Sequence, residues 1–524
     1  MTSCLLLVSH VALAEDSIKS PNIILFLADD MGMGDTSAYQ DWTGNPDNAQ
    51  LHTPAMDRLA KMGVRFTDAH SPSSRCSPSR YALLTGRYCW RTHLKHWVLF
   101  GVHCDPLIER KRLTMPEFLR AAGYQTGMVG KWHLGLKYHN EDGGVAEGWK
   151  DADLSKPLAD GPIDHGFDFF HGISRSHPTS GPDKQRNGPN QTRGPGWMHN
   201  REITGLTGNG KEIKGYHLNK LAEVLDEQAF AFLDPAIANK EPFFLYFASP
   251  ANHGPYTPSA SLHGTKIAGA SRNVDGPPAK LRKRLDFVYQ NDVHIARLME
   301  YLRSTDDPRQ PGRKLFDNTL FIFSSDNGAE KNDKQFTGPL RSNKGSTYEG
   351  GHRVPFIATW PAGGIGDGKA DTPGRTCDRL LSLTDVYATF ADILGKPLPP
   401  LKGDTYGAED SVSQLAAMQG NKYAPRIPLF SNDHNEASKK LANERAWVAI
   451  HSHACPRPGK WKLFLDHHYA FKKQINPKEL YELQSDQEET NNLLGDKQQK
   501  VIDFLIEQAK LAAGDNGSTR QLEK

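Results

Sequence analysis

Short, almost wholly apolar runs alternate along this chain with longer segments whose apolar residues recur at helical spacing. The run 22–27 has the composition of a central parallel strand that is covered on both faces. In segment 53–62, a threonine able to cap a helix and a proline in the first turn precede apolar residues at helical spacing. The same patterns predict strands at 125–129, 243–248 and 319–323, and helices at 114–122, 217–233 and 281–303. The alternation predicts an α/β domain with a large mixed, mostly parallel sheet flanked by helices.

A different pattern begins after the proline-rich run 397–400. Short runs with strand composition follow at 447–450, 461–465 and 479–483, and a final helix is predicted at 497–512. We therefore expect a main domain over residues 15–400 and a smaller α+β subdomain, with a short antiparallel sheet, over 401–524. Segment 176–215 is rich in Gly, Pro and Asn, and we expect it to be a long surface excursion.

Charge and hydropathy argue against several classes of function. The chain has 524 residues and a formal net charge of +2, so no strong field favours binding to nucleic acid or to an acidic membrane. No apolar stretch is long enough to span a bilayer, so no membrane span is expected. Apolar residues at 5–8 and 11–14, before Glu15 and Asp16, are similar to the core and cleavage site of a secretory signal. We expect residues 1–14 to be a signal peptide and the protein to be exported (periplasmic or extracellular); a buried N-terminal strand is the alternative.

Acidic pairs follow two of the predicted strands. Asp29 and Asp30 come directly after the first strand, and Asp326 and Asn327 come after the strand at 319–323. Ligands of open α/β sheets bind beyond the carboxyl ends of the strands, so these side chains are expected to converge. Three carboxylates and an amide oxygen make an all-oxygen site suited to Ca²⁺ or Mg²⁺. Taken alone, each pair would be better explained as a strand-end turn.

Basic side chains also follow predicted strands. Lys131 and His133 come after the strand at 125–129, and in an extended backbone they would point roughly the same way. His253 follows the strand at 243–248, and its reference pKa allows both protonation states near neutrality. Lys344 lies in a polar loop after Asp326. Singly, each is more often a solvated lysine or a hydrogen-bonded histidine.

The run Cys76-Ser77-Pro78-Ser79-Arg80, followed by Leu84-Thr85-Gly86-Arg87, gives these clusters a common interpretation. It resembles the maturation signature of type I sulfatases, in which the cysteine is oxidised to formylglycine. The alternative is a purely structural interpretation, in which the run is a polar turn with a buried cysteine nearby. The resemblance extends from about residue 21 to 493, and it implies an alkaline-phosphatase-like fold with a catalytic domain at 15–400. It also implies a metal site of Asp29, Asp30, Cys76, Asp326 and Asn327, occupied by Ca²⁺ in preference to Mg²⁺.

The resemblance further implies a role for each catalytic residue. The hydrated formylglycine from Cys76 would attack sulfur, with Arg80 and the cation holding it and Asp326 accepting its proton. Lys131 and Lys344 would neutralise the sulfate oxygens. His253 would protonate the departing oxygen, and His133 would be the base that releases sulfate. The implied partners are a sulfated saccharide substrate and a formylglycine-generating maturation enzyme.

Several alternatives stay open on the sequence alone. The closest is a phosphonate or phosphate ester hydrolase of the same superfamily; the others are a non-catalytic carbohydrate-binding protein, should Cys76 stay unmodified, and a secreted structural protein. Tyr81 and the run 90–92 resemble the branch of galactose- and N-acetylgalactosamine-6-sulfatases. Loss of Cys4 with the signal and conversion of Cys76 would leave four cysteines, which permits disulfides. Of these, Cys89–Cys104 is the easier pairing and Cys377–Cys455 the other.

Overall fold

The computed structural model describes most of the chain after residue 19. The described ranges are 20–43, 51–95, 97–99, 105–148, 151–175, 194–208, 211–213, 217–273, 279–330, 334–426, 428–434, 446–467, 475–514 and 517–522. The predicted signal peptide and Cys104 lie outside these residues, so the expectation of export stays a prediction.

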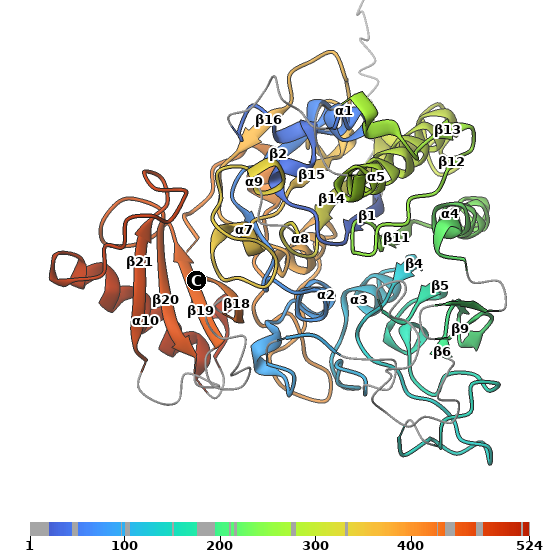
Figure 1. The fold of residues 1–524 in the computed structure, drawn as a ribbon, viewed down its shortest axis with the longest axis horizontal. Coiled ribbons are helices and arrows are strands. Elements are labelled where there is room, and N and C mark those ends of the chain that lie inside the picture. The colour runs from blue at the N-terminus through green and yellow to red at the C-terminus, as the bar shows by residue number, and fades with distance from the viewer. Residues whose placement is uncertain are drawn as a thin grey trace, which may run out of the picture.

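A ten-stranded sheet crosses the larger part of the molecule (Figure 1). Its strand order is β16-β2-β15-β14-β1-β11-β4-β5-β7-β8, with parallel pairs from β14 through β1, β11 and β4 to β5. Antiparallel pairs join β14 to β15, β15 to β2, β5 to β7 and β7 to β8. The mixed, mostly parallel sheet is thus confirmed. The strands are β1 Asn22–Ala28, β2 Val64–Phe66, β4 Gln125–Lys131, β5 Phe169–Ile173, β7 Met198–His199, β8 Glu202–Ile203, β11 Phe243–Ala248, β14 Thr319–Ser325, β15 Phe356–Thr359 and β16 Arg375–Cys377.

Helices cover both faces of this sheet. Alternate residues of β1 enter two separate cores: Ile23 and Leu25 pack with α2, α3 and α8, whereas Ile24 and Phe26 pack with α1, α4 and α5. This explains why β1 reads as a continuous apolar run. None of the described helices combines the length and apolarity needed to cross a bilayer. The helices are α1 Pro54–Met62, α2 Cys76–Thr85, α3 Met115–Ala121, α4 Leu221–Ala238, α5 Ala279–Ser304 and α8 Asp385–Ile393.

A smaller antiparallel sheet lies at one end of the molecule, drawn in orange and red in Figure 1. Its strands are β18 Leu429–His434, β19 Ala446–Ser452, β20 Trp461–His467 and β21 Pro477–Glu482, and α10 Gln499–Ala513 packs against it. Three of these strands and the helix match the predicted elements. The first strand, β18, had no prediction. The exact boundary at residue 400 stays a prediction.

Two segments contain regular structure that the sequence patterns did not predict. Cys76–Thr85 forms helix α2 rather than a polar turn, with Pro78 accommodated in its first turn. In the predicted excursion, β7 and β8 extend the edge of the main sheet, and β6 Gly194–Pro195, β9 Leu206–Gly208 and β10 Lys211–Ile213 form a separate small sheet. The excursion therefore covers a sheet edge in the residues that the structure describes.

The cysteines give no support to the proposed disulfides. Cys89, Cys377 and Cys455 are free thiols. Cys377 and Cys455 are both described and unbonded to each other, so that pairing is not made. Cys89 is buried at the start of η3 (Cys89–Arg91), with its Sγ 3.5 Å from Thr92 Oγ1.

The stacked aromatic pair at the centre of the sheet supplies a test of the core. The rings of Phe26 and Phe247 lie 4.7 Å apart between centroids and are fully buried. We expect Phe26→Ala to lower the free energy of unfolding by about 3–5 kcal/mol, because it opens a cavity between two central strands. Urea titration followed by tryptophan fluorescence measures this. Val145→Ala, at a site that is 59% exposed, should change stability by less than about 0.5 kcal/mol. Equal effects of the two substitutions would contradict the assignment of β1 to the core.

Candidate active site

The two acidic pairs meet because β1 and β14 are adjacent, parallel and in register. Ala28 lies opposite Ser325, so Asp29 and Asp326 leave the sheet side by side. The Asp326 amide donates to the Ala28 carbonyl at 3.1 Å, and the Asp30 amide donates to Asp326 Oδ1 at 3.2 Å. All three carboxylates are completely buried. The strand-end convergence predicted from the sequence is therefore present.

Helix α2 delivers the cysteine to this cluster. Cys76 is the first residue of α2, and its Sγ lies 3.6 Å from Asp29 Oδ1. One potential ligand atom from each of Asp29, Asp30, Cys76 and Asp326 lies within 4.8 Å of the others. Arg80, one turn further along α2, places Nε 3.0 Å and Nη2 2.8 Å from Asp326 Oδ2. Cysteine and arginine therefore face the cluster together because they are one helical turn apart.

Each carboxylate is paired with a different basic side chain. Lys131 at the end of β4 places Nζ 2.7 Å from Asp29 Oδ2. Lys344, in the loop after β14, places Nζ 2.6 Å from Asp30 Oδ2, and Arg80 serves Asp326. Burial raises the pKa of Asp30, but Lys344, His253 and Lys131 together outweigh burial, and the net pKa lies below its usual value. Burial and the neighbouring Asp29 raise the pKa of Asp326 to about 6 in the absence of a bound cation.

The cysteine thiol itself is a poor nucleophile in this environment. Burial raises the pKa of Cys76 to about 12, so the unmodified side chain is a neutral thiol at physiological pH. The thiolate is the reactive form of cysteine.

Hydrogen bonds to backbone carbonyls fix the orientation of the two histidines expected at the site. The His253 Nδ1 lies 2.7 Å from the Gly254 carbonyl, which can only accept, so Nδ1 carries the proton; Nε2 lies 4.0 Å from Asp30 Oδ2. Burial and Lys344 lower the pKa of His253 to about 3 in the free protein. His133 donates from Nε2 to the Leu99 carbonyl at 3.0 Å, and its Nδ1 has no hydrogen-bond partner among the described residues. Burial, with a contribution from Lys131, holds the pKa of His133 well below its usual value.

The backbone at His133 differs from the extended conformation assumed in the sequence analysis. His133 has φ 57°, in the left-handed region, so it does not continue the strand that ends at Lys131. Lys131 still influences the pKa of His133, so the two side chains belong to one electrostatic environment.

The donor set fits a hard divalent cation. Asn327 donates from Nδ2 to Asp30 Oδ1 at 2.8 Å and to the Gly328 carbonyl at 2.9 Å. Its Oδ1 is buried and has no hydrogen-bond partner among the described residues. A buried acceptor without a donor is costly, and a cation would satisfy it. Together with the carboxylates, this oxygen makes a set suited to Ca²⁺.

The sequence analysis did not identify the residues that hold the backbone of the acidic cluster in place. Arg284 of α5 is completely buried; it pairs with Asp35 and donates to the Asp30 carbonyl at 3.2 Å. The Ser325 hydroxyl accepts from the Met31 amide at 2.9 Å. Arg284 lies in a basic, helical run where solvent exposure is the ordinary expectation, so no local signal distinguished it.

Comparison with known proteins identifies the family. Residues 21–396 match the family model described as Sulfatase. An N-acetylgalactosamine-6-O-sulfatase of Bacteroides thetaiotaomicron is 28% identical over 91% of this chain and 90% of its own, and arylsulfatase A of Homo sapiens is 33% identical over 79% and 70%. A solved structure from work on glycosaminoglycan metabolism by Bacteroides thetaiotaomicron has a TM-score of 0.68 at 27% identity, covering 93% of this chain and 98% of that one. The chain therefore belongs to the sulfatase family, and it is an enzyme of sulfate ester hydrolysis.

Proposed function

We propose that the protein hydrolyses sulfate esters of a carbohydrate, with formylglycine made from Cys76 as the nucleophile and one bound Ca²⁺. The observation that carries the proposal is the convergence of Cys76 with Asp29, Asp30 and Asp326 in one buried cluster. The names of the similar proteins, an N-acetylgalactosamine-6-O-sulfatase among them, support a sulfated sugar as substrate. Export, by the N-terminal signal, is part of the same proposal.

The charge balance of the site favours an anionic substrate. The three carboxylates are matched by Arg80, Lys131 and Lys344. Addition of a divalent cation to this balanced set leaves an excess of positive charge in a buried volume. A sulfate ester carries the opposite charge, and its interactions are strengthened where water is excluded.

The proposed roles follow from where each group lies. Asp29, Asp30, Asp326 and Asn327 would hold the cation, which would supply charge stabilisation to the reacting oxygens. Asp326 accepts the proton of the attacking hydroxyl, and Arg80 fixes its carboxylate. Lys131 and Lys344 face the sulfate oxygens.

The histidines take the remaining proton transfers. His133 has a buried nitrogen with no partner among the described residues and so is available as the base that releases sulfate. His253 can donate from Nε2 only when its ring is charged, since Nδ1–H is already directed at Gly254. A bound anionic ester favours that charged form.

The first test concerns Cys76 and the reaction class. After expression with a maturation system, peptide mass spectrometry should show an aldehyde in place of the Cys76 thiol. Matured enzyme should release sulfate from an aryl sulfate, and from some of a panel of defined sulfated saccharides, faster than it cleaves the matching phosphate and phosphonate. Cys76→Ala should lower activity by more than about 10³-fold because the nucleophile is lost.

Cys89→Ala is the matched control, since Cys89 is also a buried free thiol. That variant should keep both the aldehyde and the activity. Full activity with an unmodified Cys76 would overturn the nucleophile assignment. Preferred turnover of phosphate or phosphonate would instead favour the related hydrolase class, and sugar binding without turnover by matured protein would favour a binding protein.

The second test concerns the cation. We expect one Ca²⁺ per chain, and Asp326→Asn should weaken Ca²⁺ binding by more than about 100-fold and abolish turnover, because it removes the negative charge of a proposed ligand and the carboxylate that accepts the proton. Elemental analysis and calorimetric titration measure the binding. Asp307→Asn, at another buried aspartate, should leave both unchanged. Undiminished activity in protein shown by elemental analysis to be free of metal would exclude the role of Ca²⁺.

The third test concerns His253 as the acid for the leaving group. A sugar oxygen needs a proton to depart, whereas nitrophenolate does not. His253→Ala should therefore reduce kcat for a sulfated sugar about 10²–10⁴-fold, and reduce kcat for nitrophenyl sulfate far less. His263→Ala, at an exposed histidine paired with Asp226, is the control. Equal losses of kcat for both substrates would transfer the acid role to Lys344, and similar rises in KM alone would indicate ground-state binding.

A further inference from the structure

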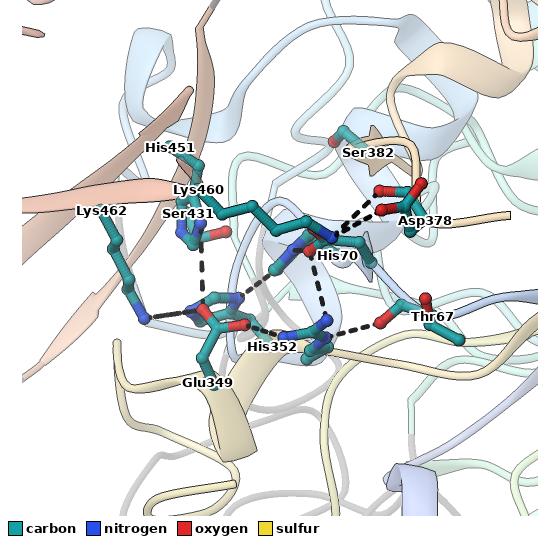
Figure 2. A network of polar contacts seen from close by, with 12 residues as sticks. Thr67, His70, Glu349, His352, Asp378, Ser382, Ser431, His451, Lys460 and Lys462 are labelled. Atoms are coloured by element: carbon teal, nitrogen blue, oxygen red, sulfur yellow. Dashed lines mark hydrogen bonds and ion pairs between the residues drawn. The ribbon is translucent and has the colours of Figure 1, made fainter. Parts of the chain in front are cut away.

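A second buried cluster of ligand-type side chains lies between the two sheets. His70, in β3 (Ala69–His70), meets Glu349 and His352 from α7 (Glu349–His352) and His451 from β19. One potential ligand atom from each lies within 4.8 Å of the others, and no side chain is more than 2% exposed. Figure 2 shows these four side chains converging, with His451 contributed by the C-terminal sheet.

Hydrogen bonds fix which nitrogen of two rings carries the proton. The His70 Nε2 lies 2.8 Å from Asp68 Oδ1, and Asp68 also pairs with Lys460 at 3.2 Å, so this carboxylate is an ionised acceptor. The His352 Nε2 lies 2.9 Å from the Thr347 carbonyl, which can only accept. In its neutral form each of these rings therefore carries its proton on Nε2 and a lone pair on Nδ1.

Lys462 competes for one of these atoms but has better acceptors. Its Nζ lies 3.2 Å from His352 Nε2. It also lies 2.9 Å from Glu349 Oε1 and 2.7 Å from Glu489 Oε1. The two shorter, charge-assisted bonds outweigh the contact with the ring. Thr347 is accordingly the partner of His352 Nε2.

The two lone pairs point at each other. Nδ1 of His70 and Nδ1 of His352 are 3.0 Å apart, a distance at which two acceptors repel unless a cation lies between them. His451 brings a third ring to the same place. Two facing acceptors and a third imidazole thus meet at one point.

The spacing fits a tetrahedral metal ion. Bonds of about 2.0–2.1 Å to nitrogen and oxygen place tetrahedral ligand atoms roughly 3.3–3.4 Å apart. The two Nδ1 atoms are 3.0 Å apart, and His451 Nδ1 lies 3.9 Å from Glu349 Oε1. The three ring centroids are 4.7, 5.1 and 5.3 Å apart, so the rings surround one point.

We propose that His70, His352, His451 and Glu349 bind one structural Zn²⁺ ion. Imidazole nitrogens suit zinc and do not suit Ca²⁺, so this site and the active site would take different metals. Four protein ligands close the site, as in structural zinc centres. The Asp68 carboxylate and the Thr347 carbonyl accept hydrogen bonds from Nε2 of His70 and of His352. Metal-bound histidines are oriented by such bonds from the ring nitrogen that does not bind the metal. The ion would fasten β19 to β3 and α7.

Metal analysis of the full chain tests the proposal. Protein expressed with zinc and calcium in the medium should contain one zinc per chain by elemental analysis. Diffraction at the zinc absorption edge should place the anomalous peak between His70 and His352. His451→Gln should lower the zinc content at least about tenfold and reduce thermal stability. His171→Gln, in a second histidine pair with His199 on the edge of the main sheet, should retain zinc.

The zinc content and the anomalous peak of the wild-type protein test the proposal even when a variant does not fold. Absence of stoichiometric zinc, or an anomalous peak at any other place, would overturn the proposal and leave a proton shared between His70 and His352. Asp326→Asn should lose Ca²⁺ and keep zinc, because Asp326 is not a zinc ligand. The proposal is independent of the sulfatase chemistry, so its failure would leave that function untouched.

Discussion

The structure depends on the burial of three carboxylates at the carboxyl end of the central strands. An isolated buried carboxylate costs several kcal/mol even after relaxation, and loss of its partner costs about 3–5 kcal/mol. Burial of Asp29, Asp30 and Asp326 is tolerated because Lys131, Lys344 and Arg80 lie within 2.8 Å of them. These basic side chains come from three segments: β4, a loop after β14, and α2. The site therefore assembles only when three distant segments are already in place, and the same pairs that hold it together position the groups that would face a sulfate.

Much of this arrangement was predictable because it follows from strand order. The apolar runs that become β1, β4, β11 and β14 are buried on both faces, and such strands are recognisable in the sequence as continuous apolar runs. In a parallel sheet the residues after each strand share one edge, so the acidic and basic groups could be placed together before any coordinates were known. The roles of those groups came from the resemblance to sulfatases and not from the strand pattern.

Other elements had no local signal. Helix α2 is buried along its whole length, so it lacks the amphipathic spacing that identifies a helix, and its first turn contains serines and a proline. The first strand of the C-terminal sheet, β18, ends in Ser431-Asn432-Asp433-His434, a run typical of a turn. Arg284 reaches Asp30 across 254 positions of the chain, and the histidine cluster joins His70 to His451 across most of it. Such contacts follow from tertiary packing, which a single sequence does not specify locally.

The C-terminal sheet is connected to the active site through α7. The Gly328 amide, directly after Asn327, donates to the Gly351 carbonyl at 2.9 Å, and the Ser71 amide, which leads toward Cys76, donates to the His352 carbonyl at 2.7 Å. Both loops of the active site therefore rest on the backbone of α7. Lys462 of β20 donates to the Glu349 side chain of the same short helix, and the Glu489 carboxylate accepts from the Glu349 backbone amide. A helix of four residues has little stability of its own, so its position depends on these tertiary contacts. The smaller sheet thus contributes no residue to the acidic cluster, yet it holds the segment on which the metal-site loop and the nucleophile loop both rest.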